Sequence, residues 1–300
     1  MIDSMKKIFV ALLLVLSTSV WSQLPQIGDL YYSIHSDDQY AEVSSIPRFN
    51  ATYNWLVVVE IPSHVTYKGV TYPVKEIGYN AFNYSPTLIS ITIPSMVSYI
   101  SEQAFMGCDA LVEVNLPNTI TSLSKSLFRS CKSLNSIVIP NSVKEIKSGV
   151  FYNCTSLQSI VVPDAVQYIG GEAFRNCYSL ESIHLGKGLT SIGECAFAYC
   201  SSLTEITIPN NVKRIGNQAF YGCSSLRTVN IQNGVISIGE EAFRACSNLT
   251  TIALPATVMT IEDDAFYGCE ALTTILVPSG KKAHFMSRLD SRLHTLIKEQ

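Results

Sequence analysis

The chain has 300 residues, of which 15% are charged, and its formal net charge is −3. Its lysines and arginines form no basic stripe, which excludes the electrostatic footprint of a nucleic-acid-binding protein. A chain of this length can hold two ordinary domains, but an internal repeat, described below, predicts one long array with a cap at each end.

Residues 1–22 have the pattern of a secretory signal peptide. Lys6 and Lys7 precede an apolar run at residues 8–16, and small residues up to Ser22 follow it. A basic region, an apolar core and a small-residue exit are typical of such peptides, and we expect cleavage after Ser22. The apolar run is too short to span a bilayer, and no later segment approaches the ~20 apolar residues of a membrane helix. The pattern predicts an exported protein, secreted or at a cell surface, with no transmembrane segment after cleavage.

Residues 23–73 lack the repeat and predict an N-terminal β cap. Short runs of β-branched and aromatic residues alternate with polar ones, and two such runs flank the dipeptide of Lys68 and Gly69. A glycine turn between two such runs predicts a β-hairpin. This cap would cover the first coil of the array, which would otherwise expose an open strand edge.

Residues 74–280 contain nine copies of a 23-residue unit, without insertion or deletion. One copy, residues 166–188, reads VQYIGGEAFRNCYSLESIHLGKG. A fixed period in this range predicts a solenoid, in which each coil stacks only on its neighbours. Numbering each copy from its first residue, such as Val74 or Val166, makes equivalent positions comparable.

Several repeat positions never change in character. Position 9 is always Phe and position 15 always Leu, so both are expected to face inward. Positions 17–20 alternate outward and inward, which predicts one parallel sheet with strands ~4.8 Å apart. Five copies carry Gly at position 5, for which we expect a tight turn with positive φ. Residues 172–175 predict a single helical turn.

The string I-G-x-x-A-F-x-x-C-x-x-L-x-x-I-x-I-P resembles the BspA-type leucine-rich repeat, found in bacterial surface and secreted proteins. The resemblance covers residues 74–280. It implies a curved, mostly β, parallel solenoid that serves adhesion or protein recognition, and it implies no catalytic residues.

Residues 281–300 predict a C-terminal capping helix. Phe285, Leu289, Leu293 and Leu296 recur at helical spacing. A basic face leaves a membrane-surface helix as the alternative.

Eight of the nine cysteines occupy position 12 of the repeat. An even number in an exported chain suggests disulfides, whereas a periodic small residue suggests buried free thiols that pack as small hydrophobes. Both interpretations stay open here. A zinc site is not expected, because ligands spaced one per coil along a line cannot form a tetrahedron. The ninth cysteine, Cys195, takes position 7, which should face water.

No catalytic, cofactor-binding or metal-ligating residues are predicted. The five histidines and the cysteines do not fall together with acidic or hydroxyl side chains at regular coil positions. The glycines are spread along the coils, so no phosphate-binding loop is formed. We therefore predict no enzymatic activity, although a hydrolase with an unrecognised site is the third hypothesis considered.

The outward positions 17 and 19 are the candidate binding surface. Small apolar residues lie at its centre and polar or acidic residues at its flanks, the arrangement of an interface core and rim. Across coils two to seven the candidate residues are Glu113, Asn115, Val138, Val161, His184, Glu205 and Asn230. The competing surface carries Tyr152, Tyr178, Tyr199 and Tyr221.

The first functional hypothesis is an exported, monomeric module that binds a protein or a host extracellular-matrix component through this surface. The alternative is a structural spacer of a cell-surface layer with no specific ligand. Fold alone does not separate these hypotheses, because a solenoid is a scaffold whose working surface varies.

Overall fold

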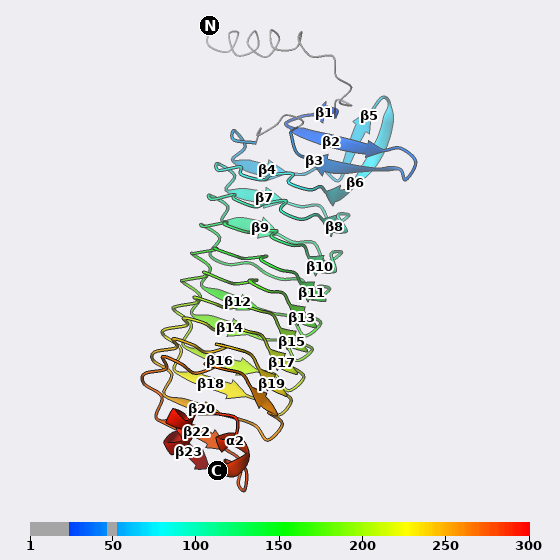
Figure 1. The fold of residues 1–300 in the computed structure, drawn as a ribbon. Coiled ribbons are helices and arrows are strands. Elements are labelled where there is room, and N and C mark those ends of the chain that lie inside the picture. Colours follow the sequence, from blue (N-terminus) through cyan, green and yellow to red (C-terminus); the bar gives the residue numbers. More distant parts are fainter. Residues whose placement is uncertain (1–23, 47–52) are drawn as a thin grey trace.

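The computed structural model describes residues 24–46 and 53–300. The chain forms a stack of coils between a small N-terminal sheet and a compact C-terminal segment (Figure 1). The expected signal peptide, residues 1–22, lies outside the described residues. No helix within the described part is long and apolar enough to cross a membrane.

One side of the stack carries parallel strands at positions 17–20, as the repeat predicts. All pairs are offset by one repeat, so that Val161 lies opposite His184. The strands are β7 (Ser90–Thr92), β9 (Glu113–Asn115), β12 (Ser159–Val161), β14 (Ser182–His184), β16 (Glu205–Ile208), β18 (Thr228–Ile231), β20 (Thr251–Ala253) and β22 (Thr274–Val277). The expectation of one continuous sheet is wrong. The third repeat forms no strand at positions 17–20 and β14 does not pair with β16, so this side consists of three separate groups of strands.

A second parallel sheet, at positions 3 and 4 of the repeat, was not predicted. It contains β10 (Ser122–Leu123), β11 (Glu145–Ile146), β13 (Tyr168–Ile169), β15 (Ser191–Ile192), β17 (Arg214–Ile215), β19 (Ser237–Ile238) and β21 (Thr260–Ile261). In the second repeat, β8 (Tyr99–Ile100) pairs instead with β6 (Val70–Ile77). Two-residue strands are too short for their alternation to stand out in a sequence.

The third side of the stack is a row of turns, which we call the turn ladder (positions 6–11 of every coil). The backbone N–H groups at positions 7, 9 and 11 donate to carbonyls of the next coil. In the fifth coil, Glu172 N lies 2.8 Å from Glu194 O and Phe174 N lies 2.8 Å from Ala196 O. These bonds run between coils, so the helical turn predicted for residues 172–175 does not form. Positions 7 and 11 have positive φ in all nine repeats.

The glycines at position 5 have a different role from the one expected. Neither Gly170 nor Gly193 has a positive φ. A Cβ added at Gly193 would lie 2.6 Å from the backbone N of Gly171, which is closer than real Cβ atoms approach. Glycine is needed here because the backbones of adjacent coils nearly touch.

The core is a spine of stacked phenylalanine rings at position 9. Adjacent ring centroids are 5.2–5.7 Å apart from Phe82 to Phe266. Tyr53 extends this spine at the N-terminal end, with its ring 5.4 Å from that of Phe82. The Tyr53 hydroxyl donates to Ser44 O and accepts from Tyr31 N. The spine therefore joins the cap to the array.

Phe174→Ala is expected to lower the free energy of unfolding by about 3–5 kcal/mol, because the removed ring is fully buried between two others. Urea unfolding followed by far-UV circular dichroism measures this change. The matched control is Val161→Ala, which removes an exposed side chain from the preceding coil. A loss below about 1 kcal/mol for Phe174→Ala would show that the spine relaxes around the gap.

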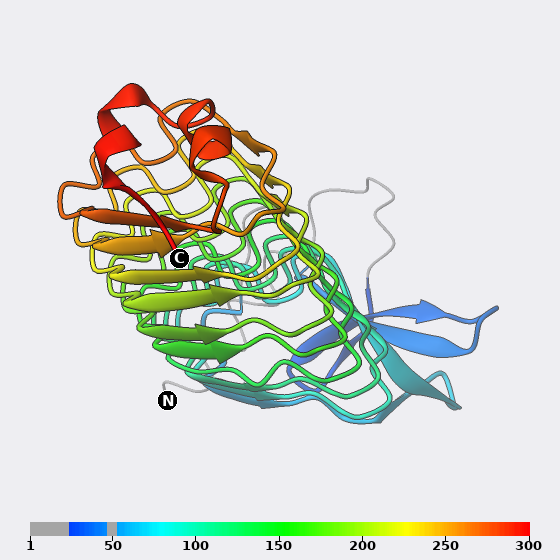
Figure 2. The ribbon, with the colours of Figure 1, turned by 90° about the horizontal axis from the view of Figure 1, so that it is seen from below.

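The N-terminal cap contains β1 (Gln26–Ile27), β2 (Leu30–His35), β3 (Tyr40–Ser44), β4 (Val58–Glu60), β5 (His64–Tyr67) and β6. The hairpin predicted around Lys68 and Gly69 is confirmed, since Tyr67 pairs with Val70 and both turn residues have positive φ. Strand β6 continues into the first repeat and β4 pairs with β7, so the cap adds to both sheets. Figure 2 shows the cap strands projecting sideways beyond the outline of the coils.

The single C-terminal helix predicted for residues 281–300 is wrong. The segment forms a short helix, α2 (Lys282–Met286), a 3-10 helix, η1 (Ser291–Leu296), and a strand, β23 (Ile297–Glu299). Strand β23 pairs in parallel with β22 and covers the open edge of that sheet. Pairing with this edge satisfies backbone groups that a continuous helix would have left exposed.

Candidate interaction surface

All seven predicted binding residues are exposed on the side of the stack that carries positions 17–20. Their inward neighbours, such as Val114, Ile160 and Ile206, are buried. The alternation predicted for this side is therefore correct. The candidates lie on or between the strands β9, β12, β14, β16 and β18, which follow one another along one side in Figure 1. Glu113 and Asn115 are on β9, Val138 follows β9, Val161 is on β12, His184 on β14, Glu205 on β16 and Asn230 on β18.

The centre of this surface is apolar and open. Val138 is 82% exposed and Val161 is 62% exposed. His184 lies beside Val161 as its register partner. Val138 belongs to the one repeat that forms no strand at positions 17–20, so its backbone is not fixed by a ladder as that of Val161 is. Single exposed apolar residues are common, but two on adjacent coils, at outward positions that are polar in the other coils from two to seven, form a small patch.

The polar flanks of the surface are mostly free of internal contacts. Within the described residues, the side chains of Glu113, Glu205 and Asn230 make no hydrogen bond or ion pair. Asn115 differs, because its Oδ1 accepts from Ile93 N of the preceding coil at 3.2 Å. It stabilises the stack and is only partly available to a partner.

The competing tyrosines lie near the turn ladder and are more constrained. The guanidinium of Arg129 lies 4.0 Å from the ring centroid of Tyr152. The rings of Tyr199 and Tyr221 meet edge to face at 5.2 Å. Tyr178 and Tyr199 are 44% and 38% exposed, whereas Tyr152 and Tyr221 are half-buried. Much of this aromatic area is already used within the fold.

The eight position-12 cysteines are free thiols that form a column beside the phenylalanine spine. Each Sγ donates to the carbonyl of the position-9 Phe in the preceding coil, as Cys177 does to Phe151 O at 3.2 Å. Burial raises the pKa of Cys154 and of Cys223 to about 12. Ser85 replaces the cysteine in the first repeat, where no repeat precedes it. Its hydroxyl is buried without a hydrogen-bond partner among the described residues.

The expectation that Cys195, at position 7, faces water is wrong. It is 4% exposed, and its Sγ lies 3.2 Å from Gln218 Oε1 of the next coil. Burial raises the pKa of this thiol as well. The thiol contacts the side chain at position 7 of the next coil, and this contact keeps it from water. A protonated, buried thiol is a poor nucleophile, so Cys195 is not suited to joining two chains.

Reductant is expected to leave the melting temperature nearly unchanged, because the thiols are not bridged. Differential scanning fluorimetry with and without tris(2-carboxyethyl)phosphine measures this. A large drop would reveal disulfides, whose loss typically costs ~2–5 kcal/mol in small secreted domains. Counting titratable thiols with Ellman's reagent in denaturant is the independent control.

The described part of the chain contains no group of three His, Cys, Asp or Glu residues placed to hold a metal ion. The cysteine column runs along the stack, which places its members one per coil, as the repeat predicts. This arrangement suits packing more than chemistry.

The comparisons with known proteins agree with this architecture. The family model described as a BspA type leucine rich repeat region with six copies matches residues 75–204 and 169–286. A leucine-rich repeat protein of Bacteroides ovatus is 29% identical, with a TM-score of 0.69 over 84% of this chain and 70% of that one. A structure named as a leucine rich cell surface protein of Faecalibacterium prausnitzii is 23% identical, with a TM-score of 0.53 over 88% and 97%. No curated protein matches the chain. The family match spans most of the array, and the chain therefore belongs to the BspA-type leucine-rich repeat family.

Proposed function

We propose that this protein is an exported, non-enzymatic and monomeric module that binds a protein or a host extracellular-matrix component. The observation that carries the proposal is the exposed pair of Val138 and Val161 at the centre of a polar face. An apolar core with a polar rim is the usual anatomy of a protein interface. The partner would lie across several coils, as partners of solenoids do.

The chemistry of the face indicates what the partner offers. Glu113 and Glu205 lie at opposite ends of the surface. His184 lies between Val161 and Glu205 along the stack. A partner with a small apolar patch and basic residues on both sides of it would complement this surface. Export to the cell surface or medium, through residues 1–22, would bring the face into contact with host proteins.

Val161→Asp is expected to weaken binding by about tenfold or more, because it places a charge at the apolar centre of the interface. His184→Asp should act in the same direction. Binding is measured by biolayer interferometry against a panel of purified serum and extracellular-matrix proteins. Thr121→Asp, at an exposed position outside this face, is the control for the added charge.

The tyrosine surface is tested with the same panel. Full binding by Val161→Asp, together with loss in Tyr178→Ala and Tyr199→Ala, would move the interface to the turn side. The spacer alternative predicts that the wild-type protein binds no member of the panel.

A further inference from the structure

The last coil of the array is not closed equally on its three sides. On one side β23 pairs with β22. On the second, Arg288 Nε donates to Met259 O at 2.6 Å, and His284 Nε2 lies 2.8 Å from Val258 O. The C-terminal segment therefore satisfies backbone groups on both of these sides.

The third side, the turn ladder, ends without a partner. In the eighth coil, the N–H groups of Glu241, Phe243 and Ala245 donate to carbonyls of the ninth at 3.1, 2.8 and 2.8 Å. The equivalent N–H groups of the ninth coil belong to Asp264, Phe266 and Gly268. None of these three donates to any acceptor in the described part of the chain. An unpaired N–H group is costly unless water or a ligand accepts from it.

These three residues line a cavity of about 660 Å³ between the last coil and the C-terminal segment. Leu289 and Leu293 line it from the opposite side. The volume of the cavity is within the usual range of ligand pockets, and it lies where a tenth coil would continue the turn ladder. Its position is at the end of the stack, away from the seven residues of the proposed binding face.

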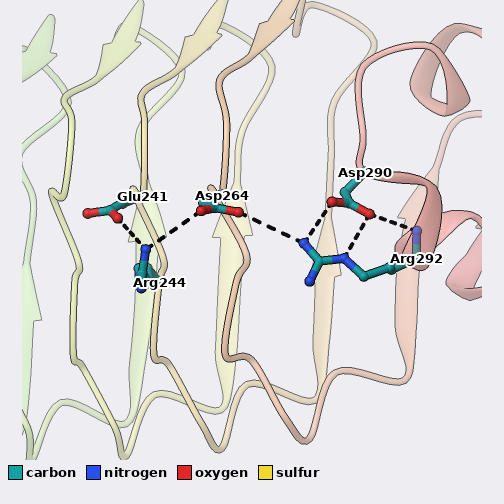
Figure 3. Close-up of polar contacts among 5 residues, drawn as sticks. All are labelled: Glu241, Arg244, Asp264, Asp290 and Arg292. Carbon is teal, nitrogen blue, oxygen red and sulfur yellow. Dashed lines mark hydrogen bonds and ion pairs between the residues drawn. The ribbon is translucent and has the colours of Figure 1, made fainter.

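A chain of ion pairs holds the two walls of this cavity together (Figure 3). Arg244 contacts Glu241 and lies 3.6 Å from Asp264. Arg292 lies 3.9 Å from Asp264 and 2.7 Å from Asp290. The arginines thus neutralise the carboxylates of this chain and tie the C-terminal segment to the last two coils.

The remaining charges in the cavity are mainly negative. Glu262, Asp263 and Glu270 line it, are exposed, and make no ion pair with any described residue. The one further cation, Arg288, is engaged with backbone carbonyls. Three free carboxylates repel a phosphate or another carboxylate, so the unpaired N–H groups are not suited to a free anion.

We propose that this end of the solenoid binds a basic peptide segment of another protein, which adopts the turn conformation of the coils and adds as one further rung of the turn ladder. Carbonyls of alternate peptide residues accept from the N–H groups of Asp264, Phe266 and Gly268, as carbonyls of the next coil do elsewhere in the array. Lysine or arginine side chains of the peptide meet Glu262, Asp263 and Glu270. Backbone hydrogen bonds supply affinity and the charges supply selectivity, a division of roles also found where a peptide adds to a sheet edge.

The test uses the full chain and an acetylated, amidated octapeptide of alternating lysine and valine. Hydrogen exchange followed by NMR reports on each amide. In the free protein, the amides of Asp264, Phe266 and Gly268 are expected to exchange quickly, unlike those of Glu241, Phe243 and Ala245. The octapeptide should slow exchange at the first three and leave the second three unchanged.

Matched variants test the charges by fluorescence anisotropy of the labelled octapeptide. Glu262→Gln with Glu270→Gln should weaken binding by about fivefold, an effect expected for two exposed charge pairs. Glu181→Gln with Glu194→Gln removes the same charge from distant coils and should leave affinity unchanged. High salt should weaken the wild-type complex.

Three results would overturn the proposal. The first is binding of the octapeptide without protection of the three amides. The second is equal binding of a glutamate and valine octapeptide. The third is protection that rises with protein concentration in the absence of peptide, which would assign the site to a second copy of the chain.

Discussion

Raising the pH from 7 to 10 is expected to destabilise the protein by several kcal/mol through its buried thiols. Burial is the largest cause of the raised pKa of six thiols: Cys108, Cys131, Cys154, Cys177, Cys200 and Cys223. In the unfolded chain their pKa falls to the ordinary value of 9.0. The folded state holds these protons more tightly, so its advantage is complete below pH 9 and is lost as the pH rises towards 12. At pH 10, each such thiol costs on the order of 1 kcal/mol of stability.

Cys154→Ala isolates this effect. The variant loses stability at every pH because a buried side chain is truncated, but it has one fewer thiol to titrate. The difference between its unfolding free energies at pH 7 and pH 10 should be smaller than that of the wild type by on the order of 1 kcal/mol. Urea unfolding at both pH values measures this. Parallel stability curves for the two proteins would show that the thiols do not account for alkaline unfolding.

Deletion of residues 281–300 is expected to lower the melting temperature by on the order of 10 °C or more and to cause aggregation. The deletion removes the buried side chains of Phe285, Leu289 and Ile297 from the end of the stack. It also exposes the edge of β22, which would be free to pair with other chains. Light scattering and thermal unfolding followed by circular dichroism report both effects.

Two variants separate the causes. Phe285→Ala with Leu289→Ala removes apolar cover but keeps β23 in place, so it should lower the melting temperature without exposing the strand edge. Thr295→Ala is the control at an exposed position in the same segment. A truncated chain that stays monomeric and melts like the wild type would mean that the segment contributes nothing to closure.

The features best predicted from the sequence are those in which one residue type repeats. Phe at position 9 and Cys at position 12 recur in nearly every copy, and both side chains lie in the interior of the stack, as the repeat pattern indicates. The hairpin at Lys68 and Gly69 was predictable because a two-residue turn has a narrow sequence signature.

The left-handed conformation at position 7 was not predictable, because no single residue type marks this position. Position 7 carries residues as different as Asn80, Glu172 and Cys195, all with positive φ. The hydrogen bonds of the turn ladder offset the cost of this conformation, and they depend on neighbouring coils and not on the local sequence. The positive φ expected for the glycines at position 5 was wrong for the same reason, because a close approach between coils leaves no local signal in the sequence.

The prediction of a single helix in the C-terminal segment failed for another reason. Apolar residues at a spacing of three and four fit a helix, but the residues that cover the last coil are Phe285, Leu289 and Ile297, which come from a helix, a bend and a strand. The need to pair the edge of β22 outweighed helix periodicity. The unpaired end of the turn ladder was equally invisible, because backbone groups have no sequence identity.

Paired strands of adjacent coils are offset by a constant 23 residues. The length of the array is therefore set by the number of coils. Since each junction repeats the same bonds, a whole coil could be gained or lost between the ends without changing the chemistry of any junction. A single inserted residue would instead shift every later phenylalanine out of line. The span between the N-terminal sheet and the C-terminal segment can therefore change only in steps of about 4.8 Å. Copy number, and not the sequence within a coil, would set how far apart the two ends are held.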